Sequence, residues 1–433
     1  MNTTARQIAL LSLCRCESDG KYSNLEIDSA IKKFSLQGAE RKLYSKLVYG
    51  TIEKMITLDH VISQLSTKKL CDMTPQMKNI LRMSLYQLMY LDRIPAYSAV
   101  DEAVELAKKY VSKSSAPFVN AVLREYLRRK DKNGIKFPDK NKDYRKYLSV
   151  KYSVDTGVLD ALLSSCGDEC EKMLEFFEKN EQYITLRINT LISSSDEVIN
   201  ILSDKGIKCE KTKESPFGVR ICQNIDISTL EECVGNKAFI EDEASQIAIL
   251  SLGLLPGMSV CDVCAAPGGK SISASLVMEN KGQVCSHDLH ENKIGLIEKT
   301  AKRLGIDIIK ASQRNGKEMP SEDKVSYFDR VICDVPCSGL GVIGKKPDLR
   351  YKDMNISQLI DTQYKILCSS VHYLKEGGRL LYSTCTLNGE ENGAQVEKFL
   401  KENTGYTLLS ERTLMPHKDG TDGFYIAVIE KNG

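Results

Sequence analysis

An alternation of strand-like and helix-like segments, running from Met258 to the C-terminus, constrains the fold of this chain more than any other feature. Short apolar runs predict strands, and the segments between them, with apolar residues three and four positions apart, predict helices. Strands that alternate with helices build a mostly parallel sheet with helices on both faces. We therefore predict a doubly wound α/β domain over residues 236–433. Its expected strands are 260–264, 283–289, 306–310, 328–335, 378–385 and 424–430, and its expected helices are 271–278, 293–304, 357–374 and 389–400.

The first part of the chain shows only the helical pattern. Apolar residues recur at three- and four-residue spacing from residue 3 to about 130, and no alternating pattern interrupts them. Breaks between helices are marked by Gly20, Gly38, Pro75, Pro95 and Pro117. Residues 1–140 are therefore predicted to form an all-helical bundle that ends in a linker.

A segment of mixed pattern lies between these two regions. Within residues 141–235, a helical patch is followed by a predicted strand at 183–188, a helix that opens at Ser195, and further strands at 206–209 and 218–221. A chain of 433 residues is long enough for two or three domains of ordinary size. We predict a small α+β module here.

Charge is distributed unevenly along the chain, although the net charge is only +2. Residues 1–150 carry 27 Lys and Arg against 16 Asp and Glu, which leaves 33 basic and 42 acidic residues for the remainder. Basic residues are densest from Arg124 to Lys146, around breaks at Gly134 and Pro138. This pattern predicts contacts with the phosphates of a polyanion such as RNA, and a solvated helical surface with a tether is the alternative.

The N-terminus has no secretory signal pattern, and no apolar run approaches the roughly 20 residues that a membrane-spanning helix needs. We therefore expect a cytoplasmic protein with no membrane partner. In the reducing cytosol, the 15 cysteines are expected to be free thiols, catalytic residues or metal ligands rather than disulfides.

A glycine-containing turn follows the first strand of the α/β domain and opens a helix. The residues of this turn are Cys264, Ala265, Ala266, Pro267, Gly268, Gly269 and Lys270. Such a turn lets a ligand approach the backbone at the N-terminus of a helix, and the pattern is neither a dinucleotide fingerprint nor a P-loop. Asp288 ends the next strand, about 20 residues past the glycines, where a carboxylate can bind both hydroxyls of a ribose. A nucleoside site is therefore predicted.

Two cysteines are expected at neighbouring strand ends. The strand at 328–335 delivers Asp334 and Cys337 to its carboxyl end, and the strand at 378–385 delivers Cys385 to the same edge. A single buried cysteine is usually just a small apolar residue. Two thiols that converge beside a nucleoside pocket instead predict a catalytic role.

A zinc site is the competing interpretation of the cysteines. Three pairs have spacings that superficially resemble halves of such a site: Cys261 and Cys264, Cys333 and Cys337, and His287 and His290. We reject this interpretation because Cys261 and Cys264 would point to opposite faces of a strand, and no metal is expected.

The motifs together resemble a known enzyme family. The sequences Cys-Ala-Ala-Pro-Gly-Gly-Lys at 264–270, Asp-Val-Pro-Cys-Ser-Gly at 334–339 and Ser-Thr-Cys-Thr at 383–386 are similar to motifs of the S-adenosylmethionine-dependent RNA cytosine-5 methyltransferases of the Sun (RsmB) class. This resemblance implies a Rossmann-like methyltransferase domain over residues 236–433 and an RNA-binding role for the α+β module at 141–235.

The helical front half resembles a second family. Residues 101–109 and 118–124 are similar to the NusB family of RNA-binding helical domains. The resemblance implies that residues 1–140 form a NusB-like RNA-binding domain followed by a basic linker.

The resemblance also implies roles for individual residues. Cys385 would be the nucleophile that adds to C6 of the cytosine, and Cys337 would release the enzyme from the covalent adduct. Asp334 would bind the cytosine edge near N3 and lie close to the methyl donor. The turn at 264–270 and Asp288 would bind S-adenosylmethionine. The family usually has an Asp where Asn315 stands, and an Asn carbonyl can accept the same hydrogen bond from an adenine amino group.

The function implied is methylation of C5 of a specific cytosine in small-subunit (16S) ribosomal RNA, by a monomeric protein. Two alternatives stay open. The substrate could be transfer RNA or large-subunit ribosomal RNA, or the chain could be a non-catalytic NusB-like RNA-binding factor. The cysteine pair disfavours the second, because a binding module needs no nucleophile.

Overall fold

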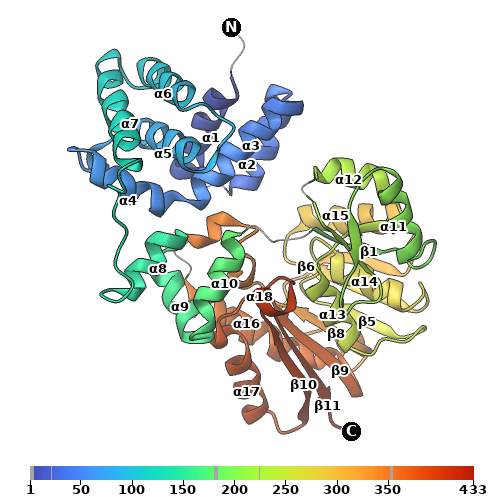
Figure 1. The fold of residues 1–433 in the computed structure, drawn as a ribbon. Helices are drawn as coiled ribbons and strands as arrows, with labels where there is room; N and C mark the ends of the chain where they lie inside the picture. The colour runs from blue at the N-terminus through green and yellow to red at the C-terminus, as the bar shows by residue number, and fades with distance from the viewer. Residues whose placement is uncertain (1–3, 21, 180–183, 224, 352–354) are drawn as a thin grey trace. The chain divides into compact units, whose positions relative to one another are not determined.

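The computed structural model describes residues 4–20, 22–179, 184–223, 225–351 and 355–433 (Figure 1). The chain divides into two compact units. The first comprises residues 1–160 together with 346–353, and the second comprises residues 161–345 together with 354–433. No described helix is long and apolar enough to cross a membrane.

The first unit is built from helices, and its described residues contain no strand. This confirms the predicted all-helical front region. Its α-helices are α1 (Ala5–Asp19), α2 (Ser23–Phe34), α3 (Gly38–Glu53), α4 (Met55–Leu65), α5 (Pro75–Tyr90), α6 (Ala96–Tyr110), α7 (Ala116–Lys130) and α8 (Tyr144–Tyr152), with α9 (Thr156–Cys166) starting in it. The predicted breaks end or begin helices: Gly20 adopts φ +62° after α1, and the Thr74 hydroxyl accepts a hydrogen bond from Met77 N to cap α5.

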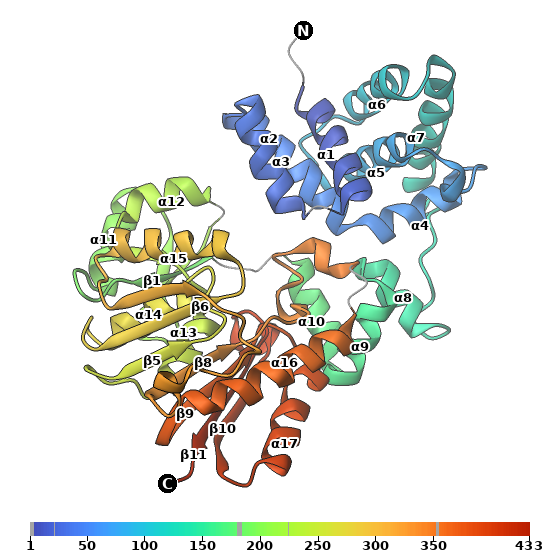
Figure 2. The same cartoon turned by 180° about the vertical axis from the view of Figure 1, so that it is seen from behind.

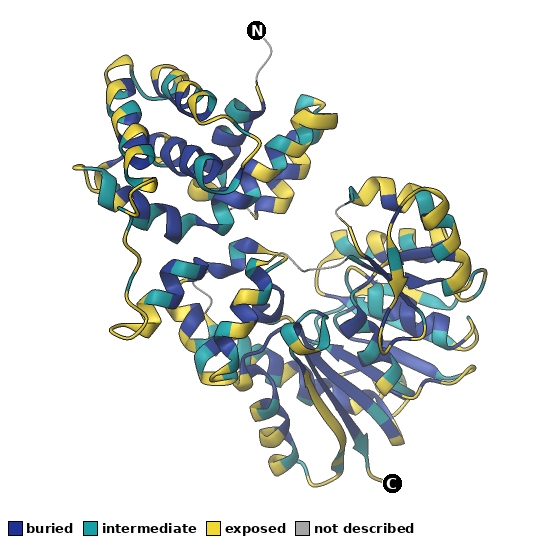
Figure 3. Ribbon diagram, viewed as in Figure 1, coloured by how far each residue is buried: buried dark blue, intermediate teal, exposed yellow. Residues whose placement is uncertain are grey.

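Helix α5 forms the centre of the first unit. It is buried on nearly all sides, whereas the surrounding helices expose one face to solvent (Figure 3). Buried residues on α5 such as Ile80, Leu81 and Leu85 pack in one core with residues of α1, α3, α4, α6 and α7. The basic run begins in α7, which continues to Lys130, and ends in α8, which begins at Tyr144, while residues 131–143 between them form the connection.

A short segment from the C-terminal half completes the first unit. We call residues 346–353 the strap. Within it, the guanidinium of Arg350 is 1% exposed and donates to the carbonyl of Tyr152 at 2.7 Å. The Tyr351 hydroxyl donates to the carbonyl of Glu53 at 2.6 Å. The strap is therefore packed into the helical unit by buried polar contacts.

The second unit contains two sheets. The smaller sheet is antiparallel, in the order β2 (Cys209–Lys211), β3 (Gly218–Ile221), β1 (Ile184–Ile188) and β4 (Ala238–Ile240). Helices α11 (Ser195–Asp204) and α12 (Ile227–Val234) pack with it, and α10 (Glu169–Glu178) precedes it. This confirms the α+β module. The strand predicted at 206–209 lies at 209–211, and Tyr183 of the strand predicted at 183–188 lies outside the described residues.

The larger sheet has seven strands in the order β10-β11-β9-β8-β5-β6-β7. Five are parallel, β11 pairs antiparallel with β9, and β10 pairs antiparallel with β11. The strands are β5 (Ser259–Asp262), β6 (Gln283–Asp288), β7 (Ile309–Gln313), β8 (Phe328–Asp334), β9 (Leu374–Thr384), β10 (Tyr406–Leu414) and β11 (Phe424–Lys431). Figures 1 and 2 show the sheet from its two sides.

Helices cover both faces of this sheet, which confirms the predicted doubly wound architecture. Helices α16 (Ile356–Ser370) and α17 (Gly393–Glu402) pack on one face against Val331, Cys333 and Leu380. Helices α13 (Glu243–Ser251) and α14 (Gly269–Val277) pack on the other face against Val260, Ile332 and Leu381. Adjacent residues of one strand thus enter different cores, as the pleat of a strand requires. Helix α15 (Glu291–Leu304) packs beside α14.

The three-domain division with boundaries at residues 140 and 235 remains our proposal. The two sheets of the second unit have separate hydrophobic cores, but β4 of the smaller sheet extends to Ile240, so the division between the two sheets falls after that residue rather than at 235. The helices of the first unit extend beyond residue 140 to include α8.

Candidate active site

The carboxyl ends of the parallel strands meet at one edge of the large sheet. The chain order reverses between the neighbouring strands β5 and β8, because β6 and β7 lie on one side of β5 and β9 lies beyond β8. Crevices at such switch points bind ligands in open α/β sheets. The predicted site residues follow β5, β6, β8 and β9, so the topology gathers them at this edge.

The turn after β5 is held by backbone hydrogen bonds. Ala265 N donates to the carbonyl of His287 at 2.8 Å, and Gly268 N donates to the carbonyl of Ala265 at 2.7 Å. Gly268 has φ +110°, a conformation that residues with a side chain rarely adopt, and a Cβ there would also approach Ile297 to 3.3 Å. Glycine is therefore required at this position.

The carboxylate of Asp288 joins this turn to the end of β6. Its oxygens accept hydrogen bonds from Ala266 N at 3.2 Å and from His290 N at 3.1 Å, and the residue is 7% exposed. The structure thus places Asp288 directly against the turn, as the sequence predicts for a nucleoside site.

Two further buried carboxylates lie beside the turn. Burial raises the pKa of Asp262 and of Glu241 to about 7. Each side chain has one oxygen without a hydrogen-bond partner among the described residues, although Ser271 donates to Asp262 and Ser273 donates to Glu241. Unpaired buried acceptors are costly, so these oxygens fit a ligand that brings hydrogen-bond donors or positive charge.

Lys270 has a partner that the sequence did not reveal. Its ammonium group lies 2.6 Å from a carboxylate oxygen of Asp334, and the Ser383 hydroxyl donates to the other oxygen at 2.7 Å. Burial alone would lower the pKa of Lys270, but the charge and hydrogen bond of Asp334 raise it above its ordinary value. The turn and the strand end of β8 are therefore linked by an ion pair.

The two predicted catalytic thiols are adjacent. The Sγ atoms of Cys337 and Cys385 lie 3.3 Å apart, and both side chains are partly buried. The pKa of Cys337 is raised well above its ordinary value, first by its hydrogen bond with Cys385 and then by burial. These two effects favour the protonated thiol at Cys337, and either sulfur can be the donor in the hydrogen bond between them.

Asn315 follows β7, close to the turn. Its side-chain oxygen accepts a hydrogen bond from Lys317 N at 3.2 Å. A Cβ on the neighbouring Gly316 would lie 3.3 Å from the carbonyl of Val263 and 3.6 Å from Cys264 Sγ. The segment therefore packs against the turn, and a contact between Asn315 and an adenine remains a prediction.

Of the cysteines considered for zinc, Cys261 and Cys333 are buried, and Cys264 and Cys337 are partly buried. Burial raises the pKa of Cys261 and of Cys264 well above the ordinary value, which opposes the thiolate form that zinc binds. Within the described ranges, no group of three or more His, Cys, Asp or Glu side chains could hold a metal ion.

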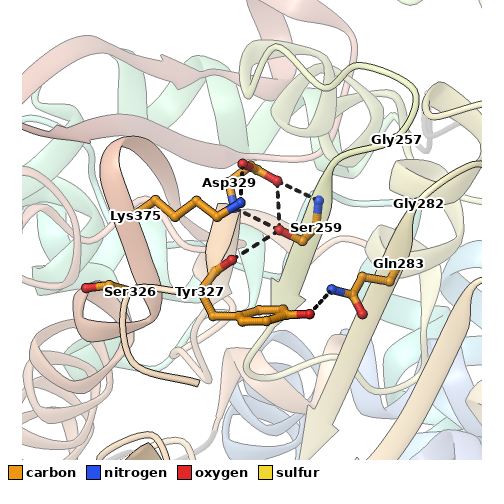
Figure 4. A pocket seen from close by; sticks show the side chains of 8 residues that line it. All are labelled: Gly257, Ser259, Gly282, Gln283, Ser326, Tyr327, Asp329 and Lys375. Atoms are coloured by element: carbon orange, nitrogen blue, oxygen red, sulfur yellow. Dashed lines mark hydrogen bonds and ion pairs between the residues drawn. The ribbon is translucent and has the colours of Figure 1, made fainter. Parts of the chain in front are cut away.

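A separate surface hollow lies at the other end of the sheet (Figure 4). It is lined by residues that precede or start β5, β6, β8 and β9, including Ser259, Asp329 and Lys375. The charged residues that line it pair with each other. The ammonium group of Lys375 lies 2.8 Å from the carboxylate of Asp329, and the Ser259 hydroxyl also donates to that carboxylate at 2.7 Å. The hollow is therefore not part of the thiol site.

Comparison with known proteins identifies the family. Residues 250–430 match the family described as 16S rRNA methyltransferase RsmB/F, residues 3–128 match the NusB family, and residues 158–228 match the ferredoxin-like domain of RsmF/B-like methyltransferases. The chain is 34% identical to the probable ribosomal RNA small subunit methyltransferase B of Bacillus subtilis (strain 168), over 100% of this chain and 99% of that protein. This chain belongs to the RsmB/F methyltransferase family. Both resemblances seen in the sequence, to the Sun (RsmB) class and to NusB, are thereby confirmed.

Further matches cover nearly all of this RsmB/F family member or about two thirds of it. The probable ribosomal RNA small subunit methyltransferase B of Synechocystis sp. (strain ATCC 27184 / PCC 6803 / Kazusa) is 32% identical, with 99% of each chain covered. Among solved structures, that of PH0851 gives a TM-score of 0.82 at 25% identity over the whole of both chains. A methyltransferase homologue from Pyrococcus horikoshii gives 0.58 at 25% identity, over 65% of this chain and 97% of that chain.

Proposed function

We propose that this protein methylates C5 of a specific cytosine in small-subunit (16S) ribosomal RNA through a covalent cysteine adduct, using S-adenosylmethionine. The observation that carries the proposal is the pair of thiols 3.3 Å apart at the strand edge, beside the turn and Asp288. The full-length relatives are named as small-subunit ribosomal RNA methyltransferases, which supports this choice of RNA.

The two thiols divide the work on the cytosine. C5 of cytosine is a poor nucleophile until a thiolate adds to C6 and moves electron density onto C5. We assign the addition to the Sγ of Cys385, which lies within hydrogen-bond distance of the Cys337 thiol. After C5 gains its methyl group and loses its proton, the C6–S bond breaks and Cys385 leaves as a thiolate. Cys337 is assigned to this release because it can hold or pass a proton next to the departing sulfur.

Asp334 and Lys270 form the polar wall of the proposed site. Asp334 would accept a hydrogen bond from the cytosine edge near N3, and Lys270 fixes the orientation of that carboxylate through the 2.6 Å contact. A preorganised ion pair in a partly buried site stabilises charge that develops on the base without reorganisation during the reaction.

The cofactor site consists of the turn and its neighbours. S-adenosylmethionine supplies an electrophilic methyl group when it is bound. The residues that would hold it are Cys264, Ala265, Ala266, Pro267, Gly268, Gly269, Lys270, Asp288, Asn315 and Asp334. Asp288 suits ribose hydroxyls, and the unpaired buried oxygens of Asp262 and Glu241 suit a ligand that carries positive charge.

RNA binding is assigned to the helical front region and its basic run. The target base must be splayed or flipped out of any helix to reach the thiols, which costs a few kcal/mol. We propose that the protein acts as a monomer in the cytoplasm. Transfer RNA or large-subunit ribosomal RNA remains the alternative substrate.

Methyl incorporation separates these alternatives. The protein would be incubated with labelled S-adenosylmethionine and with unmodified small-subunit RNA, large-subunit RNA or transfer RNA, and the product nucleoside would be identified by mass spectrometry. We expect 5-methylcytosine at one position of small-subunit RNA. Methylation confined to another RNA would change the assigned substrate, and RNA binding without methyl transfer would favour a non-catalytic factor.

A further inference from the structure

A buried carboxylate lies behind the two thiols. Glu391 is fully buried, and its side chain accepts hydrogen bonds from Ser338 N at 2.8 Å, Gln363 Nε2 at 2.8 Å and Asn388 Nδ2 at 3.0 Å. The Ser338 hydroxyl also donates to it. The described residues provide no cation for an ion pair with Glu391, so these four donors compensate its charge.

The contacts of this carboxylate hold both sides of Cys337. Ser338, the residue after Cys337, is bound to Glu391 through its backbone N–H. The residue before it, Pro336, accepts a hydrogen bond on its carbonyl from Gln363 Nε2 at 3.0 Å, the same amide group that donates to Glu391. The backbone of Cys337 is therefore fixed at the peptide groups on either side.

The next residue holds Cys385 in the same way. The side-chain oxygen of Asn392 accepts from the Thr384 hydroxyl at 2.6 Å, and its amide group donates to the carbonyl of Thr386 at 3.0 Å. The hydroxyls of Ser338 and Thr386 lie 2.7 Å apart and join the two loops. Two consecutive side chains, Glu391 and Asn392, thus bracket one thiol each.

This arrangement matters because both sulfur atoms must serve the same base. A displacement of about 1 Å in a reacting group can cost roughly a hundredfold in rate, and site residues need neighbours that lock their positions. A carboxylate with all its acceptor positions occupied is such a neighbour, since moving either loop would break a hydrogen bond to a buried charge.

We propose that Glu391 and Asn392 are positioning residues that set the separation between the Sγ atoms of Cys337 and Cys385. The inference rests on the proposed function for the catalytic roles of the two thiols, and the hydrogen bonds that hold the two loops are independent of those roles. Neither residue contacts a reacting atom in this assignment, and each acts through the loop that it holds.

The separation of the thiols can be measured without RNA or cofactor. The oxidant diamide takes two protons and two electrons from a pair of thiols, giving one disulfide and a hydrazine, and this requires the sulfur atoms to come within bonding distance. The rate of formation of the Cys337–Cys385 disulfide, followed by peptide mass spectrometry on the full-length protein, reports on their placement.

Glu391→Gln keeps the size of the side chain but replaces an acceptor with a donor, and Asn392→Asp removes the donor to Thr386. We expect each change to slow formation of the Cys337–Cys385 disulfide roughly tenfold or more. Glu390→Gln is the matched control, because Glu390 is exposed next to the same site, and its rate should equal that of the wild type. If Glu391→Gln does not fold, Ser338→Ala takes its place, because it removes one of the hydroxyls that donate to Glu391. Wild-type rates in folded Glu391→Gln, or in both Asn392→Asp and Ser338→Ala, would overturn the proposal.

Enzyme kinetics distinguish this inference from the proposed function. With a methylating wild type, Glu391→Gln should lower kcat with little change in KM for RNA. A wild type that forms the disulfide rapidly but methylates no RNA would refute the proposed function alone. A methylating wild type whose Glu391→Gln variant oxidises at the normal rate would refute the positioning role alone.

Discussion

At the scale of single residues, the surroundings of Cys337 favour its protonated form. Hydrogen bonding to Cys385 and burial both raise the pKa of Cys337. A protonated thiol that points at a second sulfur stabilises that sulfur as a thiolate. This direction agrees with the separate roles proposed for the two residues.

Replacing each thiol should therefore have a different result. Cys385→Ala should abolish turnover and any covalent RNA complex, because the nucleophile is gone. Cys337→Ala should let the adduct form and accumulate, because release is impaired. Denaturing gels of each variant with RNA and S-adenosylmethionine measure the adduct, and accumulation in Cys385→Ala would reverse the assignment.

Asp288 should control affinity for the cofactor. Asp288→Ala removes a charge-assisted acceptor and should weaken binding of S-adenosylmethionine by roughly 1.5 to 3 kcal/mol. The side chain also holds Ala266 N and His290 N, so the comparison needs Asp288→Asn, which keeps one acceptor and should lose less. Calorimetry on variants of unchanged melting temperature measures the affinity for S-adenosylmethionine. Wild-type affinity in Asp288→Ala would mean that Asp288 only holds the turn and does not bind the cofactor.

The buried carboxyl of Asp262 should make stability depend on pH. Its pKa is raised from 3.8 to about 7 by burial, so the folded protein binds this proton more tightly than the unfolded chain does. The resulting stabilisation is fully present below about pH 3.8 and is lost as the pH rises through about 7. The unfolding free energy of the wild type should fall between pH 5 and pH 8. In Asp262→Asn this fall should be smaller by roughly 1 to 3 kcal/mol. Denaturant unfolding at both pH values tests this, and parallel curves for wild type and variant would contradict it.

At the scale of elements, the sequence predicted the strands that lie inside the sheet and missed one at its edge. The centre of the strand β8, Val331 to Cys333, is buried and reads as an apolar run. The strand β10 pairs only with β11 and is largely exposed, so its sequence of mixed polar residues carries no alternation. Burial produces the pattern that sequence analysis detects, and β10 lacks it. The other edge strand, β7, was predicted three residues too early, at 306–310.

The same distinction applies to the site. The residues at strand ends, such as Asp288 and Cys385, could be predicted because topology alone brings strand ends together. The partners of Glu391 could not, since Ser338 and Gln363 lie 53 and 28 residues away in the chain and meet it only through folding. The ion pair of Lys270 with Asp334 is of the same kind.

The basic run from Arg124 to Lys146 should determine the salt dependence of RNA binding. Several of its residues are already paired, as Arg145 is with Asp160, but Lys132, Lys142 and Lys146 are exposed. Replacing these three lysines with glutamine should weaken RNA binding and reduce the slope of log K against log salt by up to about 0.7 for each phosphate that is no longer neutralised. Filter binding at several salt concentrations measures the slope. The control replaces three exposed lysines elsewhere, Lys299, Lys302 and Lys401, and an equal slope in both variants would assign the segment to a solvated surface.

At the scale of the whole molecule, the strap makes the helical unit depend on the C-terminal half of the chain. Arg350 is buried among groups of the helical unit, including the carbonyl of Tyr152 and, at 3.6 Å, the carboxylate of Glu53. Removing a buried donor leaves such acceptors unsatisfied, at a cost of roughly 1 to 3 kcal/mol.

Arg350→Ala should therefore loosen helices of the first unit. We expect faster amide hydrogen exchange in α8 and around the junction of α3 and α4, with Arg350→Lys giving a smaller change. Exchange followed by mass spectrometry on the full chain compares these segments directly. Unchanged protection in Arg350→Ala would mean that the strap only rests on the surface of the helices.

The strap also limits how this protein can be taken apart. The chain crosses between the two units after residue 160, after residue 345 and after residue 353. A protease that cuts at one of these crossings leaves the two units connected by the other two crossings. A single cut therefore does not separate the units while the strap stays packed in the first unit. A fusion protein that contains only residues 1 to about 140 would have the front helices but would lack the strap, residues 346–353, which belongs to the same unit. The helical unit therefore cannot be moved into another protein as one continuous stretch of sequence.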